Sequence, residues 1–497
     1  MASANIAIED RMQRDHDAHS FRTAILPVGF LLAILVYGLV VRPLWLDQPA
    51  LPLEVVFLLA SAFAVTQLRV LGHTWQQIQE SIVQRMGRGV PGFFVLFSIG
   101  MLIGSWIVSG TIPMLVHWGV QVLDPQWFYL LAFLVPVVFS TLTGTSWGSA
   151  GTVGVVIMGI AMSIDADVAI TAGAVIGGAY FGDKMSPLSD TTNMAALGAD
   201  VDLFEHIRSM MWTTVPAAVI AATVYTIVGF VDTPVGSATT ADSTEFLAAL
   251  ERLFVFHPVL LLPPVVVLIG SIRRMPTIPV LGTAILLAAV LALLVQPFSV
   301  ISVCQSLTTG FNVDMATTAG ELPAAVVSLV ERGGLYSMRE AIFVAFMVFF
   351  FIGIIDRIQA MPIVVGRLFG FAVTQSATVL SALMSAGLTN ALTANQYATS
   401  FIIGDAFKQR FDDLGIPRRV LSRSIEDTGT MIESLVPWHP TALFMVATLG
   451  VPVAEYWNWQ LLTLSNLVIA PVLAVTGIGC AYGARKALAA TGDSQAS

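Results

Sequence analysis

The sequence predicts an all-α polytopic membrane protein, and its composition and its hydropathy pattern both support that fold class. Hydrophobic residues make up 56% of the 497 residues and charged residues only 11%, whereas a soluble domain usually carries about 25% charged residues. Apolar runs recur along the whole chain, and a run of about 20 helical residues crosses the hydrocarbon core. Because backbone polar groups in lipid must bond within the protein, we expect these runs to form helices.

The same composition argues against several other classes of protein. The net charge of −9 includes no basic stripe, so nucleic acid is not an expected partner. The chain has neither a Gly-x-x-x-x-Gly-Lys-Ser/Thr loop for ATP nor the HExxH spacing of a membrane zinc protease. We therefore expect a transporter rather than an enzyme, with no bound cofactor and with the lipid bilayer as its surroundings.

Polar and Gly/Pro-containing breaks divide the chain into twelve predicted membrane segments. Two of these segments, 127–163 and 371–407, are long enough to be hairpins or paired crossings. The intervening stretches 72–89 and 357–370 are amphipathic, and we expect them at the membrane interface. The twelve segments are 24–44, 51–71, 91–117, 127–163, 166–200, 209–231, 256–271, 277–297, 339–356, 371–407, 424–450 and 458–482.

Lys and Arg residues predict the orientation, because cytoplasmic loops carry an excess of them. The strongest cluster runs from Lys408 to Arg423, and Arg69, Arg85 and Arg88 mark another loop as cytoplasmic. Loops near 118–126, 163–167 and 232–251 carry no Lys or Arg and are placed outside. We expect a multi-pass protein of the inner (cytoplasmic) membrane, divided into a cytoplasmic tail (1–23), a first transmembrane half (24–231), an extracytoplasmic loop (232–255), a second half (256–482) and a cytoplasmic tail (483–497).

A weak internal repeat indicates two inverted-topology repeats, with broken helices and hairpins that meet at the membrane midplane. A polar break at Gly144 and an acidic break at Asp183 match a polar break at Thr389 and an acidic break at Asp427, about forty residues apart in both halves. Many transporters are built from such repeats. Chance similarity among Gly-rich membrane helices is the alternative explanation.

The most informative stretch lies at the first acidic break, where Asp183, Lys184 and Asp190 follow a hydrophobic run. A charge at the bilayer centre costs at least about 2.5–3.5 kcal/mol, so such a charge is rarely without function. Pro187 would break the helix and free backbone carbonyls. Carbonyl, hydroxyl and carboxylate oxygens together suit a hard cation. Alternatively, Asp183 and Lys184 neutralise each other near the surface, although adjacent side chains on a helix point apart.

The second acidic break carries three carboxylates, of which Glu426 and Asp427 come first. Both follow the basic cluster closely. They could therefore be interfacial partners of Arg419 or Arg423 rather than functional groups. The sequence leaves these two possibilities open.

Glu433 and His439 lie further into the second break, and a membrane histidine near a carboxylate can relay protons. Two hydroxyl- or amide-rich breaks complete the polar set. Small residues there also favour tight helix packing, but packing does not explain the adjacent amides and hydroxyls. The side chains that we single out in these two breaks are Thr145, Ser146, Asn390 and Gln396.

The run Gly-Asp-x-x-Ser-Pro-x-Ser-Asp-Thr-Thr at Gly182–Thr192 resembles the hallmark of the NhaC-type sodium/proton antiporters. The resemblance extends from about residue 50 to residue 480. It implies a secondary transporter of the wider ion-transporter superfamily, with two inverted repeats. Further matching stretches are Gly144–Gly148, Ala394–Tyr397, Glu426–Thr430 and Pro437-Trp438.

One stretch departs from that family. Where the resemblance leads us to expect Ser-Pro-Leu-x-Pro-Trp-Asn, this chain has Glu-Ser-Leu-Val-Pro-Trp-His at Glu433–His439. A new carboxylate and a new imidazole could change the choice of ion or the coupling to protons. The family also includes a malate/lactate exchanger type, so the substrate stays open.

Sodium/proton exchange is the leading functional hypothesis. Burial disfavours the charged form of a carboxyl group, so Asp190, or Asp183 with it, would hold a proton until a sodium ion binds and expels it. The predicted ion ligands are Asp183, Asp190, Ser186, Ser189, Thr191, Asn193, Thr145, Ser146, Asn390 and Gln396. The predicted proton-coupling residues are Asp190, Asp183, Glu433, His439 and Asp427.

The rival hypothesis is a proton- or sodium-coupled exchanger of a small organic solute, such as malate, lactate or an amine. The positive ends of broken helices suit carboxylates, and Lys184 could bind one as a point charge. The sequence also leaves open whether the chain works as a homodimer.

Overall fold

The computed structural model describes residues 21–234, 241–316, 322–369 and 372–482, and this part of the chain is helical with no strand. Eight helices there are long and apolar enough to cross a membrane, or up to ten if two bent pairs each form one span. The bent pairs are Thr244–Leu253 with Pro258–Ile272, at 95°, and Val453–Trp459 with Leu461–Thr476, at 58°. The predicted all-α polytopic fold class is confirmed.

The first part of the chain begins with a helical segment at Phe21–Trp45. It continues through α3 (Leu53–Val70), α4 (Trp75–Val108), α5 (Thr111–Val122), α6 (Phe128–Thr143), α7 (Ser146–Ser149), η3 (Ala150–Gly154), α8 (Val155–Ser163), α9 (Val168–Met185), α10 (Asp190–Gly198) and α11 (Leu203–Val231).

The connecting region holds α12 (Ala241–Leu253), α13 (Leu262–Ile272), α14 (Thr277–Val295), α15 (Val300–Thr308) and α16 (Ala324–Val330). The second part then runs through α17 (Arg339–Asp356), α18 (Ala360–Phe369), α19 (Gln375–Thr393), α20 (Gln396–Asp413), α21 (Arg418–Ser424), η7 (Ile425–Thr430), α22 (Pro440–Leu449), α23 (Val453–Tyr456) and α24 (Leu461–Thr476).

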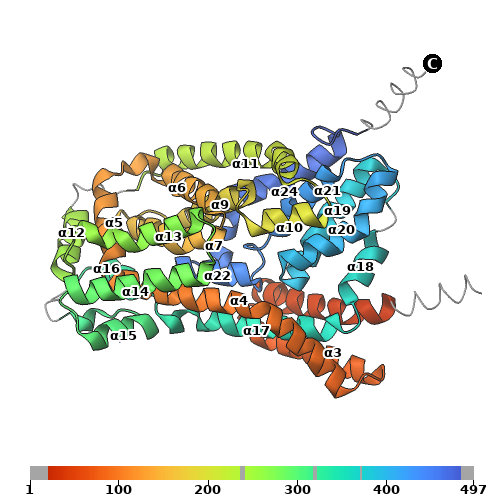
Figure 1. Cartoon of the computed structure of the whole chain (residues 1–497), viewed down its shortest axis with the longest axis horizontal. Coiled ribbons are helices and arrows are strands. Elements are labelled where there is room, and N and C mark those ends of the chain that lie inside the picture. The colour runs from red at the N-terminus through yellow and green to blue at the C-terminus, as the bar shows by residue number, and fades with distance from the viewer. Residues whose placement is uncertain (1–20, 235–240, 317–321, 370–371, 483–497) are drawn as a thin grey trace, which may run out of the picture.

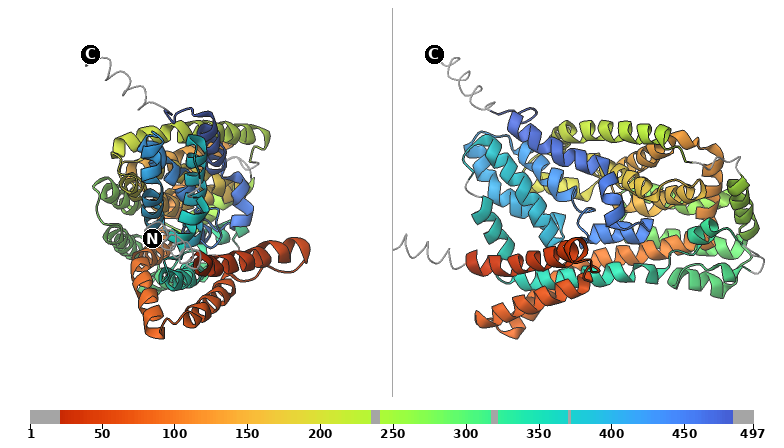
Figure 2. Two further views of the ribbon diagram at one scale, coloured as in Figure 1. Left: turned by 90° about the vertical axis from the view of Figure 1, so that its right-hand side faces the viewer. Right: turned by 180° about the vertical axis from the view of Figure 1, so that it is seen from behind.

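The molecule is elongated, and the short helices α7, α10 and α22 lie near its middle (Figure 1). Helices α4 and α17 run side by side along one edge, and α11 runs along the opposite edge. The N-terminal helix and α3 lie on the α4–α17 side of the body (Figure 2). The broken helices are therefore enclosed between two layers of long helices.

The outward faces of the long helices carry large apolar side chains, as expected for contact with lipid. On α11, Val219, Ile220 and Ile227 are exposed, and on α14 Leu286 and Leu294 are exposed. Exposed apolar surface of this extent would mark a soluble protein as prone to associate. In a bilayer the same apolar surface contacts the lipid tails.

The two halves repeat one order of elements around two left-handed turns. Gly144 (φ 70°) separates α6 from α7, and Ala394 (φ 49°), 250 positions later, separates α19 from α20. The next residues, Thr145 and Asn395, cap α7 and α20 with their side chains. In each half a further helix then breaks and continues as a short one, α10 or α22.

The 250-residue offset corrects the predicted register of the repeat. It pairs Asp183 with Glu433 and Pro187 with Pro437, so the predicted match between Asp183 and Asp427 was wrong. That match relied on acidic residues alone, whereas the turn geometry sets the register.

Helix α4 overturns two further expectations, because a single helix covers Trp75–Val108. A capping box between Thr74 and Gln77 starts it, and it continues through Pro91. The stretch 72–89 is therefore the start of a span and not a separate interfacial helix. Arg85 and Arg88 lie within this helix and not in a loop, and Arg85 is buried, where its Nη2 donates to the Thr393 carbonyl oxygen at 2.6 Å.

The predicted ends of the domains fall mostly outside the described residues. Of the predicted tails 1–23 and 483–497, the structure describes only residues 21–23, and these belong to the first helix. Within the predicted loop 232–255, residues 241–253 form helix α12.

Glycines set the close helix contacts that hold the broken helices in place. A Cβ at Gly178 or Gly182 on α9 would lie 2.2 Å from a backbone atom of α6, the Phe133 oxygen or the Thr141 nitrogen. A Cβ at Gly404 on α20 would lie 1.9 Å from the carbonyl oxygen of Gly198 on α10. Small residues at such crossings let the two backbones approach, so α9 and α10 are placed by backbone contact.

We expect Gly404→Ala to lower the free energy of unfolding by about 1–3 kcal/mol, the usual cost of extra volume in a packed contact. Gly282→Ala in α14 is the matched control, since nothing lies within 4 Å of a Cβ there. That control should be neutral or slightly stabilising. Thermal unfolding in detergent measures both, and equal melting temperatures would contradict the close crossing of α10 and α20.

Candidate functional site

The first break lies between α9 and α10, where Ser186–Ser189 interrupt the helix. Pro187 in this segment cannot donate a backbone hydrogen bond, which is why the helix does not continue. Ser189 then caps the next helix, since its Oγ accepts from the Thr192 backbone nitrogen at 3.4 Å. The break leaves Asp183 in the last turn of α9, facing the start of α7.

Asp183 is buried, with 5% of its surface exposed, and hydroxyl groups surround its carboxylate. Oδ2 accepts from the Oγ and the backbone nitrogen of Ser146, at 2.7 and 3.2 Å, and Oδ1 accepts from Ser189 Oγ at 2.6 Å. The Oγ1 of Thr191 lies 3.0 Å from Ser189 Oγ. The structure therefore brings four of the predicted ligands, Asp183, Ser146, Ser189 and Thr191, into one cluster.

Asp190 lies apart from this cluster. It is the first residue of α10 and is exposed, although we expected it to be buried. Its Oδ2 accepts a hydrogen bond from the hydroxyl of Tyr397 on α20. The seven-residue spacing from Asp183 would put both carboxylates on one face of a continuous helix, but the break redirects the second one.

Three further predicted ligands form hydrogen bonds with the backbone at the helix breaks of the first half. Thr145 Oγ1 accepts from the Gly148 nitrogen at 3.2 Å, and Ser186 Oγ accepts from the Leu188 nitrogen at 3.2 Å. Asn193 Nδ2 donates to the carbonyl oxygens of Pro187 and Ser189, at 3.2 and 2.5 Å. These contacts fix the shape of the turn around Asp183.

The second break gathers Glu433 with polar side chains of α19, α20 and the start of α22. Asn390 Nδ2 donates to Glu433 Oε1 at 2.9 Å and to Gln396 Oε1 at 3.0 Å. Thr441 Oγ1 donates to Glu433 Oε2 at 2.9 Å. His439 Nε2 lies 3.4 Å from Asn390 Oδ1 and 3.9 Å from Glu433 Oε1. All five side chains are buried.

The two clusters are equivalent under the repeat. Glu433 occupies the position of Asp183, and the 250-residue offset also pairs His439 with Ser189. Each carboxylate is followed by a proline, Pro187 or Pro437, and then by a short helix. Glu433 and His439, where this chain departs from the expected family pattern, therefore lie at the positions equivalent to Asp183 and Ser189.

A buried ion pair joins the two halves. Lys184 Nζ contacts Asp427 Oδ1, and the side chains are 0% and 1% exposed. Thr213 Oγ1 donates to the same oxygen at 2.8 Å, and Asn466 Nδ2 donates to the Asp427 carbonyl oxygen at 2.8 Å. Lys184 therefore neutralises Asp427 across the repeat, and the alternative pairing with Asp183 is wrong.

The interfacial explanation for the acidic pair of η7 also fails. Arg419 pairs with Glu205 at 2.7 Å on an exposed surface. Arg423 does approach Asp427, at 3.7 Å, but both side chains are buried, with 2% and 1% exposed. Glu426 is fully buried, and neither of its carboxylate oxygens has a hydrogen-bond partner.

Sequence reasoning missed two members of this region, Thr213 and Asn466. Asn466 was detectable, because it interrupts the apolar run of the last span. Thr213 had no such signal, since threonines are common on the same helix. The role of Glu426 was left open because arginines precede it along the chain, and only the fold shows that they turn to other partners.

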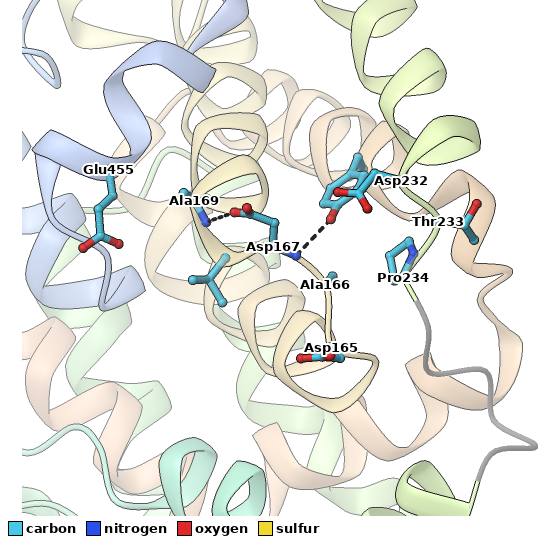
Figure 3. A pocket seen from close by; sticks show the side chains of 10 residues that line it. Asp165, Ala166, Asp167, Ala169, Asp232, Thr233, Pro234 and Glu455 are labelled. Atoms are coloured by element: carbon cyan, nitrogen blue, oxygen red, sulfur yellow. Dashed lines mark hydrogen bonds between the residues drawn. The ribbon is translucent and has the colours of Figure 1, made fainter.

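An acidic cavity of about 630 Å³ lies at the end of the molecule that carries the loops predicted outside. Figure 3 shows Asp165, Asp167, Asp232 and Glu455 around it. Asp167 caps α9, since its Oδ1 accepts from the backbone nitrogens of Ala169 and Ile170. Carboxylates that line a concave surface attract cations.

Comparison with known proteins identifies relatives over most of the chain. A model described as the Na+/H+ antiporter family matches residues 178–478. An uncharacterized Na(+)/H(+) antiporter of Haemophilus influenzae is 36% identical over 88% of this chain and 92% of its own. The Na(+)/H(+) antiporter NhaC of Alkalihalophilus pseudofirmus is 33% identical, over 92% and 95%. The malate-2H(+)/Na(+)-lactate antiporter of Bacillus subtilis is 31% identical, over 82% and 86%.

Removing one partner of the buried ion pair should destabilise the fold strongly. Lys184→Met would leave Asp427 buried without its cation, so we expect a loss of about 3–5 kcal/mol in the free energy of unfolding. Lys408→Met removes a pair with Asp200, whose side chains are 21% and 57% exposed, and should cost about 0–1 kcal/mol. Denaturation of purified protein in detergent compares the two variants. Similar small losses would contradict a stabilising role of the buried pair.

Proposed function

The chain belongs to the Na+/H+ antiporter family, and we propose that it exchanges sodium ions for protons across the membrane with Asp183 as the ion-binding carboxylate. The observation that supports Asp183 is its environment. A buried carboxylate at a helix break has hydroxyl groups of Ser146 and Ser189 within 2.7 Å. No other carboxylate in the described part of the chain combines burial, a helix break and several hydroxyl neighbours in this way.

The same hydroxyl groups can serve both states of the site. A serine hydroxyl donates one hydrogen bond and offers two lone pairs, so it can donate to the carboxylate of Asp183 or turn its oxygen toward a cation. A sodium ion would neutralise the ionised carboxylate, whereas without the ion burial favours a bound proton among the broken helices instead. Competition between the two cations for this buried negative charge would couple their movements in opposite directions.

Asp190 has a different role in this proposal. Asp190 is exposed and Tyr397 donates to it. Asp190 would therefore attract the ion to the entrance of the helix break, and Asp183 would bind the ion inside it. Tyr397 belongs to the second half of the chain, so this contact links the entrance to the α19–α20 pair.

The orientation follows from the charges at the two ends of the molecule. Lys408, Arg418 and Arg419 form ion pairs on α20 and α21, whereas the acidic cavity is lined by residues around the start of α9 and the end of α11. Helices α20 and α21 lie at one end of the molecule, and α12, which follows α11 along the chain, lies at the other (Figure 1). We place the basic end in the cytoplasm, with both chain termini on that side, because cytoplasmic loops favour Lys and Arg. The acidic cavity would then receive cations from outside. Sodium ions and protons are the transported species in this proposal, and no cofactor is needed.

Exchange of an organic solute is the second candidate, because one relative is named a malate-2H(+)/Na(+)-lactate antiporter. The geometry favours an amine over a carboxylate within this class. Lys184, the expected carboxylate-binding group, is fully buried against Asp427, whereas Asp183 and Glu433 supply negative charge at the two breaks. Proteoliposomes offered sodium, lithium, potassium, malate and an amine such as arginine in turn, with internal pH as the readout, would separate these candidates.

Asp183→Asn should abolish sodium-driven proton movement in proteoliposomes, a loss of at least about a hundredfold, because the amide carries no negative charge to bind the ion. The variant should remain folded, since the amide oxygen can accept from Ser146 and the amide NH2 can donate to the hydroxyl oxygen of Ser189. A pH-sensitive dye inside the vesicles measures the rate, and size-exclusion chromatography checks the fold. Wild-type rates in folded Asp183→Asn would remove this residue from the mechanism.

Asp190→Asn should raise the sodium concentration for half-maximal exchange while leaving the maximal rate within about tenfold of wild type, because charge at an entrance steers association. Glu205→Gln is the matched control, since that carboxylate is exposed and pairs with Arg419 at the surface. A complete loss of the maximal rate in Asp190→Asn would instead place this residue at the ion site.

A further inference from the structure

We propose that Glu426 is the proton-carrying group of the exchange cycle, at a site separate from the ion-binding Asp183. This inference rests on the proposed sodium/proton exchange and gives a role to a carboxylate that the sequence left between a functional and an interfacial explanation.

Glu426 lies in the π-helical segment η7, and its side chain is fully buried. Neither Oε1 nor Oε2 has a hydrogen-bond partner. An ionised carboxylate without partners pays its full cost of desolvation, so a group in such a place becomes neutral instead. Glu426 therefore holds a proton in this conformation. π-Helical turns are frequent at functional sites, and this one places the side chain among the broken helices.

The charged groups whose field acts most strongly on Glu426 have partners of their own. Its electrostatic neighbours are Lys184, Asp183, Glu433 and Asp427. Lys184 is bound to Asp427, and Glu433 accepts hydrogen bonds from Asn390 and Thr441. Glu426 is thus left as the one carboxylate of this group without a hydrogen-bond donor, among the described residues.

Its surroundings suit a proton better than a sodium ion. A sodium ion needs several oxygen ligands, and the site at Asp183 supplies hydroxyl groups for that purpose. No hydroxyl or amide group of the residues that the structure describes is hydrogen-bonded to Glu426 in the same way, and Thr430, four residues on along η7, has a hydroxyl that also lacks a partner. A proton needs only one carboxylate oxygen.

The two sites would communicate through charge. A sodium ion at Asp183 adds a positive charge within the field that Glu426 experiences, which favours ionised Glu426. The O–H bond of the Glu426 carboxyl then breaks, and the proton passes to a water molecule on the side to which the protein is open. When the ion leaves, a proton from water on the opposite side restores the neutral acid. Each ion bound is matched by one proton released.

The test compares two readouts in the full chain, reconstituted in proteoliposomes. The first is sodium-driven proton movement, followed by an internal pH dye. The second is exchange of labelled for unlabelled sodium, which needs the ion site but no proton carrier. Glu426→Gln should lose the first by about a hundredfold and keep the second within about twofold of wild type. Asp183→Asn should lose both, and Glu205→Gln should keep both.

The outcomes separate this inference from the proposed function. Absence of sodium-driven proton movement in the wild-type protein would overturn the proposed function itself. Normal proton movement in wild type and in Glu426→Gln would overturn only the role of Glu426, as would loss of both readouts in a folded Glu426→Gln protein. If that variant does not fold, Glu426→Asp keeps a carboxyl group and should retain exchange with a displaced pH profile. An unchanged pH profile in Glu426→Asp would count against the inference.

Discussion

The buried pair between Lys184 and Asp427 is the interaction around which the centre of this protein is arranged. It joins the end of α9 in the first half to η7 in the second. Because neighbouring side chains on a helix point in different directions, the engagement of Lys184 on one side of α9 turns Asp183 toward α7. The pair carries no net charge, so it sets the position of the broken helices without itself attracting an ion.

Around this pair, burial and hydrogen bonding divide the carboxylates into distinct roles. Asp183 has hydroxyl donors, Glu433 has an amide and a hydroxyl, and Glu426 has none. The first two occupy equivalent places in the repeat, yet their neighbours differ, since Ser189 corresponds to His439. Two halves with the same order of elements therefore present chemically different sites.

Much of the architecture could be predicted because its causes are local. Long apolar runs, the polar break at Gly144 and the Ser-Pro break are visible along the chain, and they placed the helices and the first cluster. The register of the repeat, the long helix α4 and the exposure of Asp190 depend on packing between distant segments. The partner of Lys184 lies 243 positions away, and no local pattern specifies such a contact. The role of Glu426 was left open for the same reason, since its neighbours in sequence are not its neighbours in space.

The contact of Arg85 with the Thr393 carbonyl oxygen has a mechanical consequence. Thr393 immediately precedes Ala394, the left-handed turn between α19 and α20. Arg85 belongs to α4, whose 34 residues extend over about 50 Å at the usual rise of a helix. One long helix is thus hydrogen-bonded to the turn of the α19–α20 hairpin. A tilt of that hairpin relative to α4 would have to move α4 with it or break this hydrogen bond, so Arg85 couples the two elements mechanically.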